Sequence, residues 1–276
     1  MIKKTINFIW NYGRRILKEH RRIDKGIEQY VFSLKEHGLD FDLNITVLVE
    51  NKSALLIDVG YPDQGAYVKE ALDKRGIVVK KIILSHYHPD HAGGMMAFPE
   101  ATIVASKNWK TNYGNCIKWA PEVAYREVDY SIFSGEYLRF GSFRLQCFET
   151  PGHSVCGLSI MINDAFLHVG DLIMNDERER PALPLICKDG DLYAHIKSLD
   201  WLDGFADKII ILPHGKSLMT NHVIREAIKI RRSYLNSLVE AYELWHDEDY
   251  REKYLAEWSE KEWHTINMKA AKYLVL

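Results

Sequence analysis

The segment His86-Tyr87-His88-Pro89-Asp90-His91 constrains this chain more than any other, and Ala92, Gly93 and Gly94 follow it directly. It places three imidazoles and one carboxylate within six residues, just after the apolar run from Lys81 to Leu84. Neutral imidazole and carboxylate are ligands that suit zinc, iron or manganese at a hydrolytic centre. The alternative is a polar loop rich in histidine by chance, but the expected chance count is roughly one in a thousand. The segment therefore predicts a metal site.

Further candidate ligands stand at the ends of strand-like apolar runs. They occur in Thr150-Pro151-Gly152-His153-Ser154, in Gly170-Asp171 and in Pro213-His214-Gly215, and an earlier run, Leu55-Leu56-Ile57, ends in Asp58. A sheet fixes the backbone, and short loops at strand ends bring side chains from distant positions to one point. We therefore expect these side chains to gather around the histidine-rich segment.

The order of these motifs resembles that of the metallo-β-lactamase superfamily of hydrolases, from about residue 26 to residue 220, with all five characteristic motifs present. The resemblance implies an α/β fold, the αββα four-layer sandwich, with a dinuclear metal site in a cleft at one edge. It implies roles for eight residues: His86, His88 and His153 hold the first ion, Asp90, His91 and His214 hold the second, Asp171 bridges the two, and Asp58 lies buried behind them and orients the histidine-rich loop.

The last motif departs from the pattern of many members, which read Pro-Gly-His-Gly, because here His214 follows Pro213 at once. His214 is still the expected ligand, since it ends the apolar strand from Lys208 to Leu212. The competitor His222 lies two residues into an expected helix.

Composition describes an ordinary globular protein. The 276 residues are 47% hydrophobic and 27% charged, with a formal net charge of −2. The chain therefore lacks the excess of positive charge that is typical of proteins that bind nucleic acid or an anionic membrane. No run is long enough to span a membrane, and the segment from Met1 to Leu17 is too polar for a secretory signal. The four cysteines show no C-x-x-C spacing. We expect reduced thiols, a cytoplasmic location, and no nucleic-acid or membrane partner.

The pattern of apolar runs and turns predicts two β-rich halves, each covered by helices. Expected strands cover 27–34, 44–49, 54–58, 81–84, 138–140, 143–148, 158–162, 165–169 and 208–212, and expected helices cover 64–74 and 191–202. We divide the chain into an N-terminal extension (1–25), a catalytic domain (26–220) and a helical C-terminal extension (221–276) packed on that domain. The aromatic residues of the last segment are either ordinary packing residues, a roof over the cleft, or the face of a homodimer.

Two adjacent metal ions would share a hydroxide and make it a nucleophile near neutral pH. Zinc is the expected metal, with manganese or iron as alternatives. Asp90 is the candidate catalytic residue, because it could orient the hydroxide and carry a proton to the leaving group. Lys216 and Tyr193 are candidate substrate contacts. His168 and Cys156 are expected to be buried packing residues near the site rather than ligands.

The expected function is hydrolysis of a small-molecule ester, lactone or thioester, as implied by a resemblance to the glyoxalase-II-like and acyl-homoserine-lactone hydrolase members. Alternatives are a nuclease or phosphodiesterase, a β-lactamase, and an oxygen-reactive di-iron protein. Known β-lactamases of this superfamily lack the bridging carboxylate that Asp171 supplies, and the di-iron branch carries glutamate where this chain has His88. A ligand sensor without catalysis would be signalled by lost ligands, and none is lost.

Overall fold

The computed structural model describes residues 17–35, 41–218 and 220–275. Residues 1–16 of the expected N-terminal extension therefore lie outside the described part. The larger of two sheets has seven strands in sequence order, and the smaller has five strands in the order β12-β11-β10-β9-β8. The strands are β1 (Leu17–Asp24), β2 (Ile27–Ser33), β3 (Asp42–Glu50), β4 (Ser53–Ile57), β5 (Val78–Ile83), β6 (Thr102–Ser106), β7 (Tyr130–Ile132), β8 (Tyr137–Phe140), β9 (Phe143–Glu149), β10 (Leu158–Ile162), β11 (Phe166–His168) and β12 (Ile209–Ile211).

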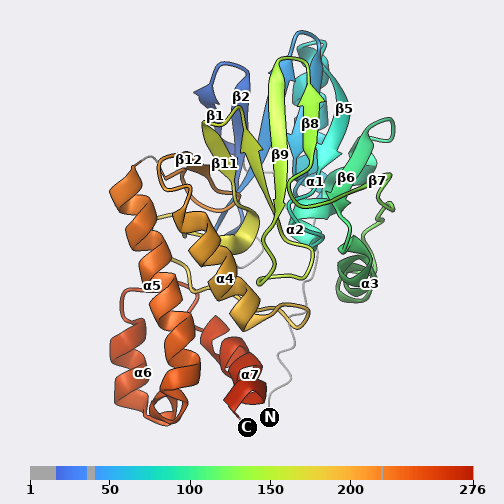
Figure 1. Ribbon diagram of the computed structural model, residues 1–276. Helices are drawn as coiled ribbons and strands as arrows, with labels where there is room; N and C mark the ends of the chain where they lie inside the picture. Colours follow the sequence, from blue (N-terminus) through green and yellow to red (C-terminus); the bar gives the residue numbers. More distant parts are fainter. Residues whose placement is uncertain (1–16, 36–40, 219, 276) are drawn as a thin grey trace.

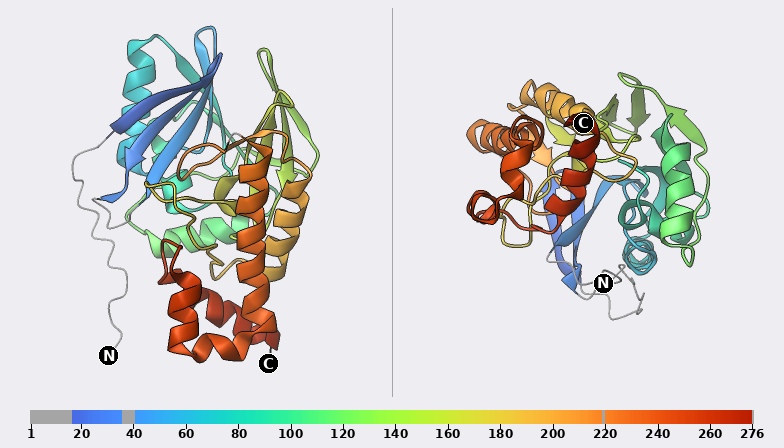
Figure 2. Two further views of the ribbon diagram at one scale, coloured as in Figure 1. Left: turned by 90° about the vertical axis from the view of Figure 1, so that its left-hand side faces the viewer. Right: turned by 90° about the horizontal axis from the view of Figure 1, so that it is seen from below.

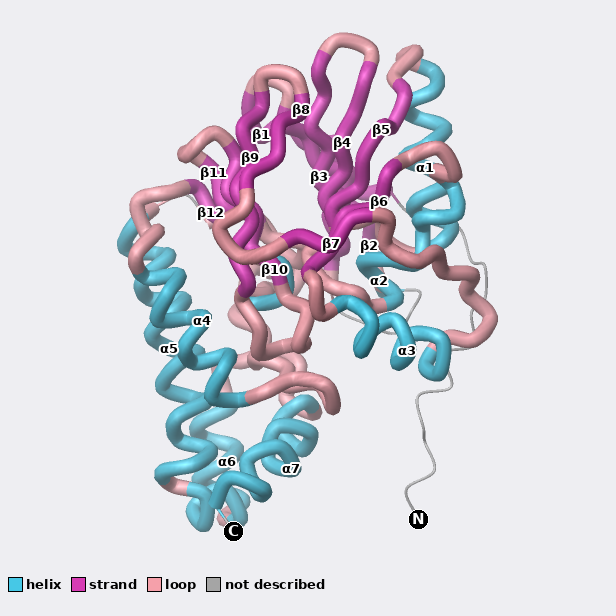
Figure 3. Tube along the Cα trace, turned by 45° about the vertical axis from the view of Figure 1, so that its right-hand side comes forward, coloured by secondary structure: helices cyan, strands magenta, loops and turns pink. Residues whose placement is uncertain are grey.

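Helices cover the outer faces of both sheets (Figures 1 and 3). The α-helices are α1 (Pro62–Lys74), α2 (Pro89–Ala92), α3 (Trp109–Trp119), α4 (Leu192–Asp203), α5 (Asn221–Glu240), α6 (Glu248–Leu255) and α7 (Trp263–Val275). Short 3-10 helices are η2 (Gly93–Ala97), η3 (Gly170–Leu172) and η4 (Tyr242–His246). Within the described ranges, no helix is both long and apolar enough to cross a membrane.

The alternation of side chains along β4 shows how the layers are built. Leu55 and Ile57 join the apolar cluster between the two sheets, together with Leu145 and Ile160 of the smaller sheet. Leu56 lies on the opposite face and joins the cluster that contains helices α1 and α3. Successive side chains of a strand point to opposite faces, so a run that is apolar throughout must be buried on both. The four-layer αββα order is therefore confirmed.

The C-terminal helices complete the fourth layer. One apolar cluster includes Leu167 of β11, Leu212 just after β12, Leu199 of α4, Ile228 of α5 and Trp245 of η4. Figure 2 shows α4 and α5 beside the smaller sheet, with α6 and α7 at the lower end of the molecule. The C-terminal segment thus packs on the same core as the sheet, while the expected homodimer stays a prediction.

The N-terminal boundary differs from the sequence-based division. Residues 17–24, which that division assigned to the extension, form strand β1, and β1 pairs antiparallel with β2 at the edge of the larger sheet. Its residues alternate between half-buried and exposed rather than apolar and polar, so the pattern LKEHRRID gives little strand signal.

Strands β4 to β7 run parallel to one another, as do β11 and β12. Parallel strands end at the same edge of a sheet. Asp58 follows β4, the histidine-rich loop follows β5, and Asp171 and His214 follow β11 and β12, while His153 follows the antiparallel strand β9.

Candidate metal centre

The histidine-rich segment forms the turn from β5 into α2, with Pro89 as the first residue of that helix. The glycines that follow are required by close packing. A Cβ atom on Gly94 would lie 2.3 Å from the carbonyl oxygen of Val59 and 2.9 Å from the Cα atom of Gly65 in α1. The chain can therefore pass this tightly only without a side chain, which brings the loop against the end of β4.

Asp58 holds this loop from beneath. Its Oδ1 atom accepts a hydrogen bond from the backbone N–H of Ser85 at 2.7 Å, and its Oδ2 atom accepts one from Ser85 Oγ at 2.7 Å. Oδ2 also lies 2.9 Å from Nδ1 of His91. Asp58 is fully buried and has a positive φ of 62°, a conformation that aspartate tolerates better than most residues. Asp58 thus lies buried beneath the histidine-rich loop and contacts His91 directly.

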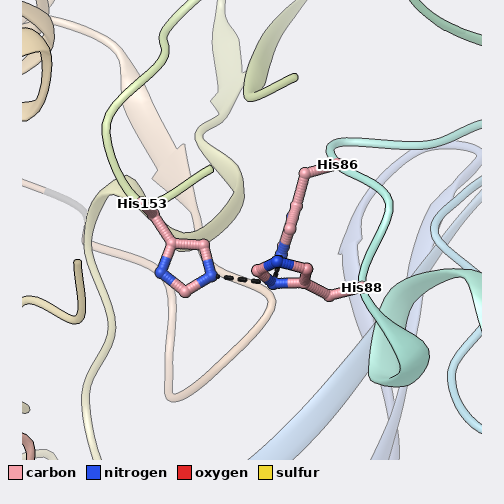
Figure 4. Close-up of side chains that lie close together, drawn as sticks. All are labelled: His86, His88 and His153. Carbon is pink, nitrogen blue, oxygen red and sulfur yellow. Dashed lines mark hydrogen bonds between the residues drawn. The ribbon is translucent and has the colours of Figure 1, made fainter. Parts of the chain in front are cut away.

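Three imidazoles meet at one point, as Figure 4 shows. The Nδ1 atom of His88 lies 3.0 Å from Nε2 of His86 and 3.0 Å from Nε2 of His153. Two nitrogens bound to one tetrahedral zinc at about 2.0–2.1 Å are separated by roughly 3.3 Å. The three ring nitrogens, all on buried side chains, are thus spaced as ligands of a single ion.

A second group of four side chains lies beside the first: Asp90, His91, Asp171 and His214. The Nε2 atoms of His91 and His214 lie 3.4 and 3.5 Å from Oδ2 of Asp90. All seven predicted ligands are therefore gathered in two adjacent groups, although they come from both sheets.

Asp171 contacts both groups. Its Oδ2 atom lies 3.4 Å from Nε2 of His153 and 3.8 Å from Nε2 of His86. Its Oδ1 atom lies 3.4 Å from Nε2 of His91 and 3.6 Å from Nε2 of His214. One oxygen thus faces each group, which is the arrangement of a carboxylate that bridges two cations.

Most of the histidines are held at the ring nitrogen that faces away from the centre. Nδ1 of His153 lies 2.8 Å from the carbonyl oxygen of Leu185, and Nδ1 of His214 lies 2.8 Å from that of Asp42. Nδ1 of His86 lies 3.2 Å from Ser85 Oγ, and Asp58 holds His91. Histidines that bind metals are oriented in this way. An acceptor beside the outer nitrogen keeps the ring proton there, so that the lone pair of the inner nitrogen points at the ion.

Unpaired polar atoms at the centre also fit a cation. Nε2 of His91 and Oδ1 of Asp171 are buried and have no hydrogen-bond partner. A buried polar atom without a partner costs about 1–3 kcal/mol, so its presence in the interior needs a reason. Two divalent ions would use both atoms. The residues present therefore fit a dinuclear metal site.

The charges of the second group also fit a bound cation. Burial by itself would raise the pKa of Asp171, but the neighbouring imidazoles of His91, His214 and His86 hold it well below its usual value. Burial opposes protonation of His91, yet Asp171, Asp90 and Asp58 raise its pKa well above the usual value. The carboxylates thus favour positive charge at this position. In the first group, burial lowers the pKa of His153 to about 4, which keeps the ring neutral as a metal ligand requires.

Asp90 differs from the other ligands in its exposure. Its side chain is 22% exposed, whereas those of His91 and Asp171 are 0% and 6% exposed. Burial by itself would raise its pKa, but the neighbouring imidazoles of His91 and His214 outweigh that effect and hold the pKa well below the usual value. Asp90 is therefore an ionised carboxylate at the open side of the centre.

Neither of the two predicted substrate contacts belongs to the ligand groups. Lys216 is largely exposed and forms an ion pair with Glu179, so its ammonium group is already engaged at the surface. Tyr193 is 45% exposed and lines a pocket of about 540 Å³ together with Pro151, Gly152, Val155, Asp189, Gly190, Asp191, Ala194 and Lys197. The sequence did not indicate Lys197, which follows Tyr193 by one helical turn on α4.

Cys156 and His168 occupy the buried positions expected of them. The Sγ atom of Cys156 accepts a hydrogen bond from the backbone N–H of Tyr87 at 3.2 Å, and Nδ1 of His168 accepts one from Gly170 N at 3.4 Å. Sequence reasoning missed Cys187, whose Sγ lies 3.9 Å from Nε2 of His153, and Asp189, which faces His88. Both lie in an irregular loop before α4, where no periodic pattern marks them.

Comparison with known families agrees with the fold. The family described as the metallo-beta-lactamase superfamily matches residues 40–214, which include the histidine-rich loop and every other candidate ligand. The chain belongs to this superfamily.

Individual relatives are distant. The chain is 28% identical to a hydroxyacylglutathione hydrolase of Brucella anthropi over 141 residues, which cover 50% of this chain and 47% of that protein. The chain thus spans about half the length of the curated relatives it matches. A solved metallo-beta-lactamase from Pontibacter korlensis superposes with a TM-score of 0.64 at 17% identity, over 79% of this chain and 98% of that one. The crystal structure of VMB-1 gives a TM-score of 0.63 at 16% identity over 80% and 99%. These two likenesses concern the fold alone.

Proposed function

We propose that this protein is a hydrolase that uses two divalent metal ions to cleave a small-molecule ester, lactone or thioester. The observation that carries the proposal is the placement of Asp171, with one carboxylate oxygen toward each ligand group. A pair of ions in such a site supplies a nucleophile from water near neutral pH and polarises the bond to be cleaved. The distant similarity to hydroxyacylglutathione hydrolases supports an acyl substrate.

The residues of the chain contribute positioning and proton transfer. Asp90 stands at the open side of the centre as an ionised carboxylate, so it can take the proton released when water adds to the acyl carbon. It then gives that proton to the alkoxide or thiolate that leaves when the acyl bond breaks. Because its pKa is held low, Asp90 keeps the proton only briefly and is free again for the next turnover.

The pocket beside His153 supports a small substrate. Gly152 precedes His153 directly, and Tyr193 and Lys197 of α4 line the same pocket. Among the lining residues that the structure describes, Lys197 is the only basic one. A nucleic-acid substrate needs several positive groups along its backbone, so this lining, with Asp189 and Asp191 beside the one lysine, favours a compact acyl compound over a nucleic acid.

The test is a hydrolysis screen of the purified, metal-analysed protein across lactones, thioesters, β-lactams and phosphodiesters. We expect turnover of a lactone or thioester, loss of it on chelation, and recovery on adding zinc or manganese. His214→Ala should abolish turnover, whereas the exposed His222→Ala should not. Turnover of RNA or of a bis-phosphodiester while every acyl substrate stays inert would contradict the proposal and favour the nuclease alternative.

A further inference from the structure

His88 is oriented differently from the other histidines of the centre. It directs Nδ1 rather than Nε2 at His86 and His153, so Nε2 is its outer nitrogen. That Nε2 atom is buried and has no hydrogen-bond partner. The edge of Trp119 in α3 packs against the same ring, with 5.4 Å between the ring centroids. His88 is therefore confined by packing, while its outer nitrogen still needs an acceptor.

Asp189 is the carboxylate that faces this nitrogen. Its Oδ2 atom lies 3.8 Å from Nε2 of His88, and its side chain is 3% exposed. Asn112, which is fully buried in α3, donates a hydrogen bond from Nδ2 to Oδ2 of Asp189. Oδ1 of Asp189 is buried and unpaired. The carboxylate is thus anchored by Asn112 and retains acceptor capacity.

We propose that Asp189 is a positioning residue for the first metal ion, acting through His88. A carboxylate near Nε2 favours the tautomer that carries its proton there, and this leaves the Nδ1 lone pair for the ion. Acceptors behind metal-bound histidines raise ligand basicity and fix ring orientation, and their loss typically costs 10–100-fold in metal affinity or activity. A shift of less than 1 Å would bring the pair into hydrogen-bond range. The Asn112–Asp189–His88 series thereby links α3 to the metal centre.

The same loop also permits a different arrangement. His88, Cys187 and Asp189 offer nitrogen, sulfur and oxygen atoms within 4.8 Å of one another, which could hold a third cation. His88 would then have to lose both ring protons and carry a cation on each nitrogen. Two further positive charges next to the first ion make that arrangement costly, so the structure favours the positioning role.

The inference rests on the proposed metal centre, and the experiment separates the two. Zinc affinity is measured by competition with a chromophoric chelator for the wild type, Asp189→Ala, Asp189→Asn and Asp191→Ala. We expect Asp189→Ala to weaken one of two ions by about 10–100-fold and to leave the other unchanged. Asp189→Asn should lose less zinc affinity than Asp189→Ala, because the amide oxygen can still accept a hydrogen bond. Asp191→Ala is the matched control: Asp191 lies in the same loop and caps α4 through Ala194 N at 2.7 Å.

Nuclear magnetic resonance of the zinc-loaded protein with labelled histidine gives a second readout. The proton of His88 should reside on Nε2 in the wild type, and Asp189→Ala should weaken or broaden that signal. Equal losses of affinity in Asp189→Ala and Asp191→Ala would overturn the inference, because loop destabilisation would then explain both. The inference would also be overturned if Asp189→Ala bound both ions as tightly as the wild type does. It would likewise be overturned if the wild type bound a third ion that Asp189→Ala does not bind. A wild type that binds no divalent ion would instead contradict the metal centre itself.

Discussion

The Oδ2 atom of Asp58 lies 2.9 Å from Nδ1 of His91, and both side chains are buried from solvent. This contact sets the proton of His91 on Nδ1, since a carboxylate can only accept. The Nε2 atom of His91 is then free toward Asp90 and Asp171. A residue at the end of β4 thus decides how a ligand on α2 is presented to the second ligand group.

Asp58→Ala should consequently lower metal affinity or activity by about 10–100-fold. The backbone N–H of Ser85 would also lose its acceptor, so a loss of stability should accompany the change. Metal competition assays on folded protein measure the first effect. The exposed Asp73→Ala, which only removes an ion pair with Lys69 in α1, is the control and should bind metal as the wild type does.

Fully loaded protein should contain two divalent ions per chain, about 3.5–4 Å apart. Seven ligand side chains are too many for one tetrahedral ion. Elemental analysis and a crystal structure of the loaded protein would test this. One equivalent of metal, with His91 and His214 not bound to it, would contradict the prediction.

Asp171→Asn should keep the fold but loosen the pair of ions. A neutral amide offers one oxygen in place of two charged ones, so it bridges two cations poorly. The measured quantities are metal stoichiometry after dialysis and the turnover of the substrate found in the screen. Retention of both ions and of full turnover would show that Asp171 does not bridge.

The predicted ligands could be found from the sequence because each follows an apolar strand-like run, and the ends of such strands converge at one edge of a sheet. Asp189 and Asn112 could not be found in this way. A carboxylate in an irregular loop and an amide in a helix belong to no sequence pattern that places them beside His88. Lys216 was placed near the centre by its neighbour His214. In the structure the Lys216 side chain forms an ion pair with Glu179 instead. A long, flexible side chain at the surface can reach a nearby carboxylate, and the sequence does not show which one. Strand β1 was missed because its polar residues face solvent at a sheet edge.

Gly152→Ala should destabilise the protein and disturb His153. Gly152 has φ +148°, and a Cβ atom there would lie 2.3 Å from the Cα atom of His195. Strain of this kind costs roughly 1–3 kcal/mol or more, measurable as a lower free energy of unfolding in urea. Gly114→Ala in α3 is the matched control, because a Cβ atom there meets nothing within 4 Å. That variant should be stabilised by about 0.5–1 kcal/mol.

His195 should make the metal-free protein sensitive to acid. Burial lowers its pKa to about 3, below the usual value of about 6.5 for an unfolded chain. Its contribution to stability is complete above pH 6.5 and is lost as the pH falls from there toward 3. His195→Gln should therefore lose less stability than the wild type on acidification, by about 1.4 kcal/mol per pH unit below 6.5.

Urea unfolding at pH 7, 6 and 5 with a chelator present measures this difference. The exposed His246→Gln is the control and should keep the wild-type slope. Parallel pH profiles for His195→Gln and the wild type would contradict the assignment.

The division of the ligands between two sheets has a consequence for how the molecule is made. The histidine-rich loop belongs to the first half of the chain, whereas His214 follows β12, the last strand. During synthesis the first group of ligands is complete once His153 has left the ribosome, but the second must wait for residue 214 and for its docking on Asp42. The three histidines of the first group are therefore available before the chain is finished, whereas the second group can form only after His214 has been made and the two sheets have come together.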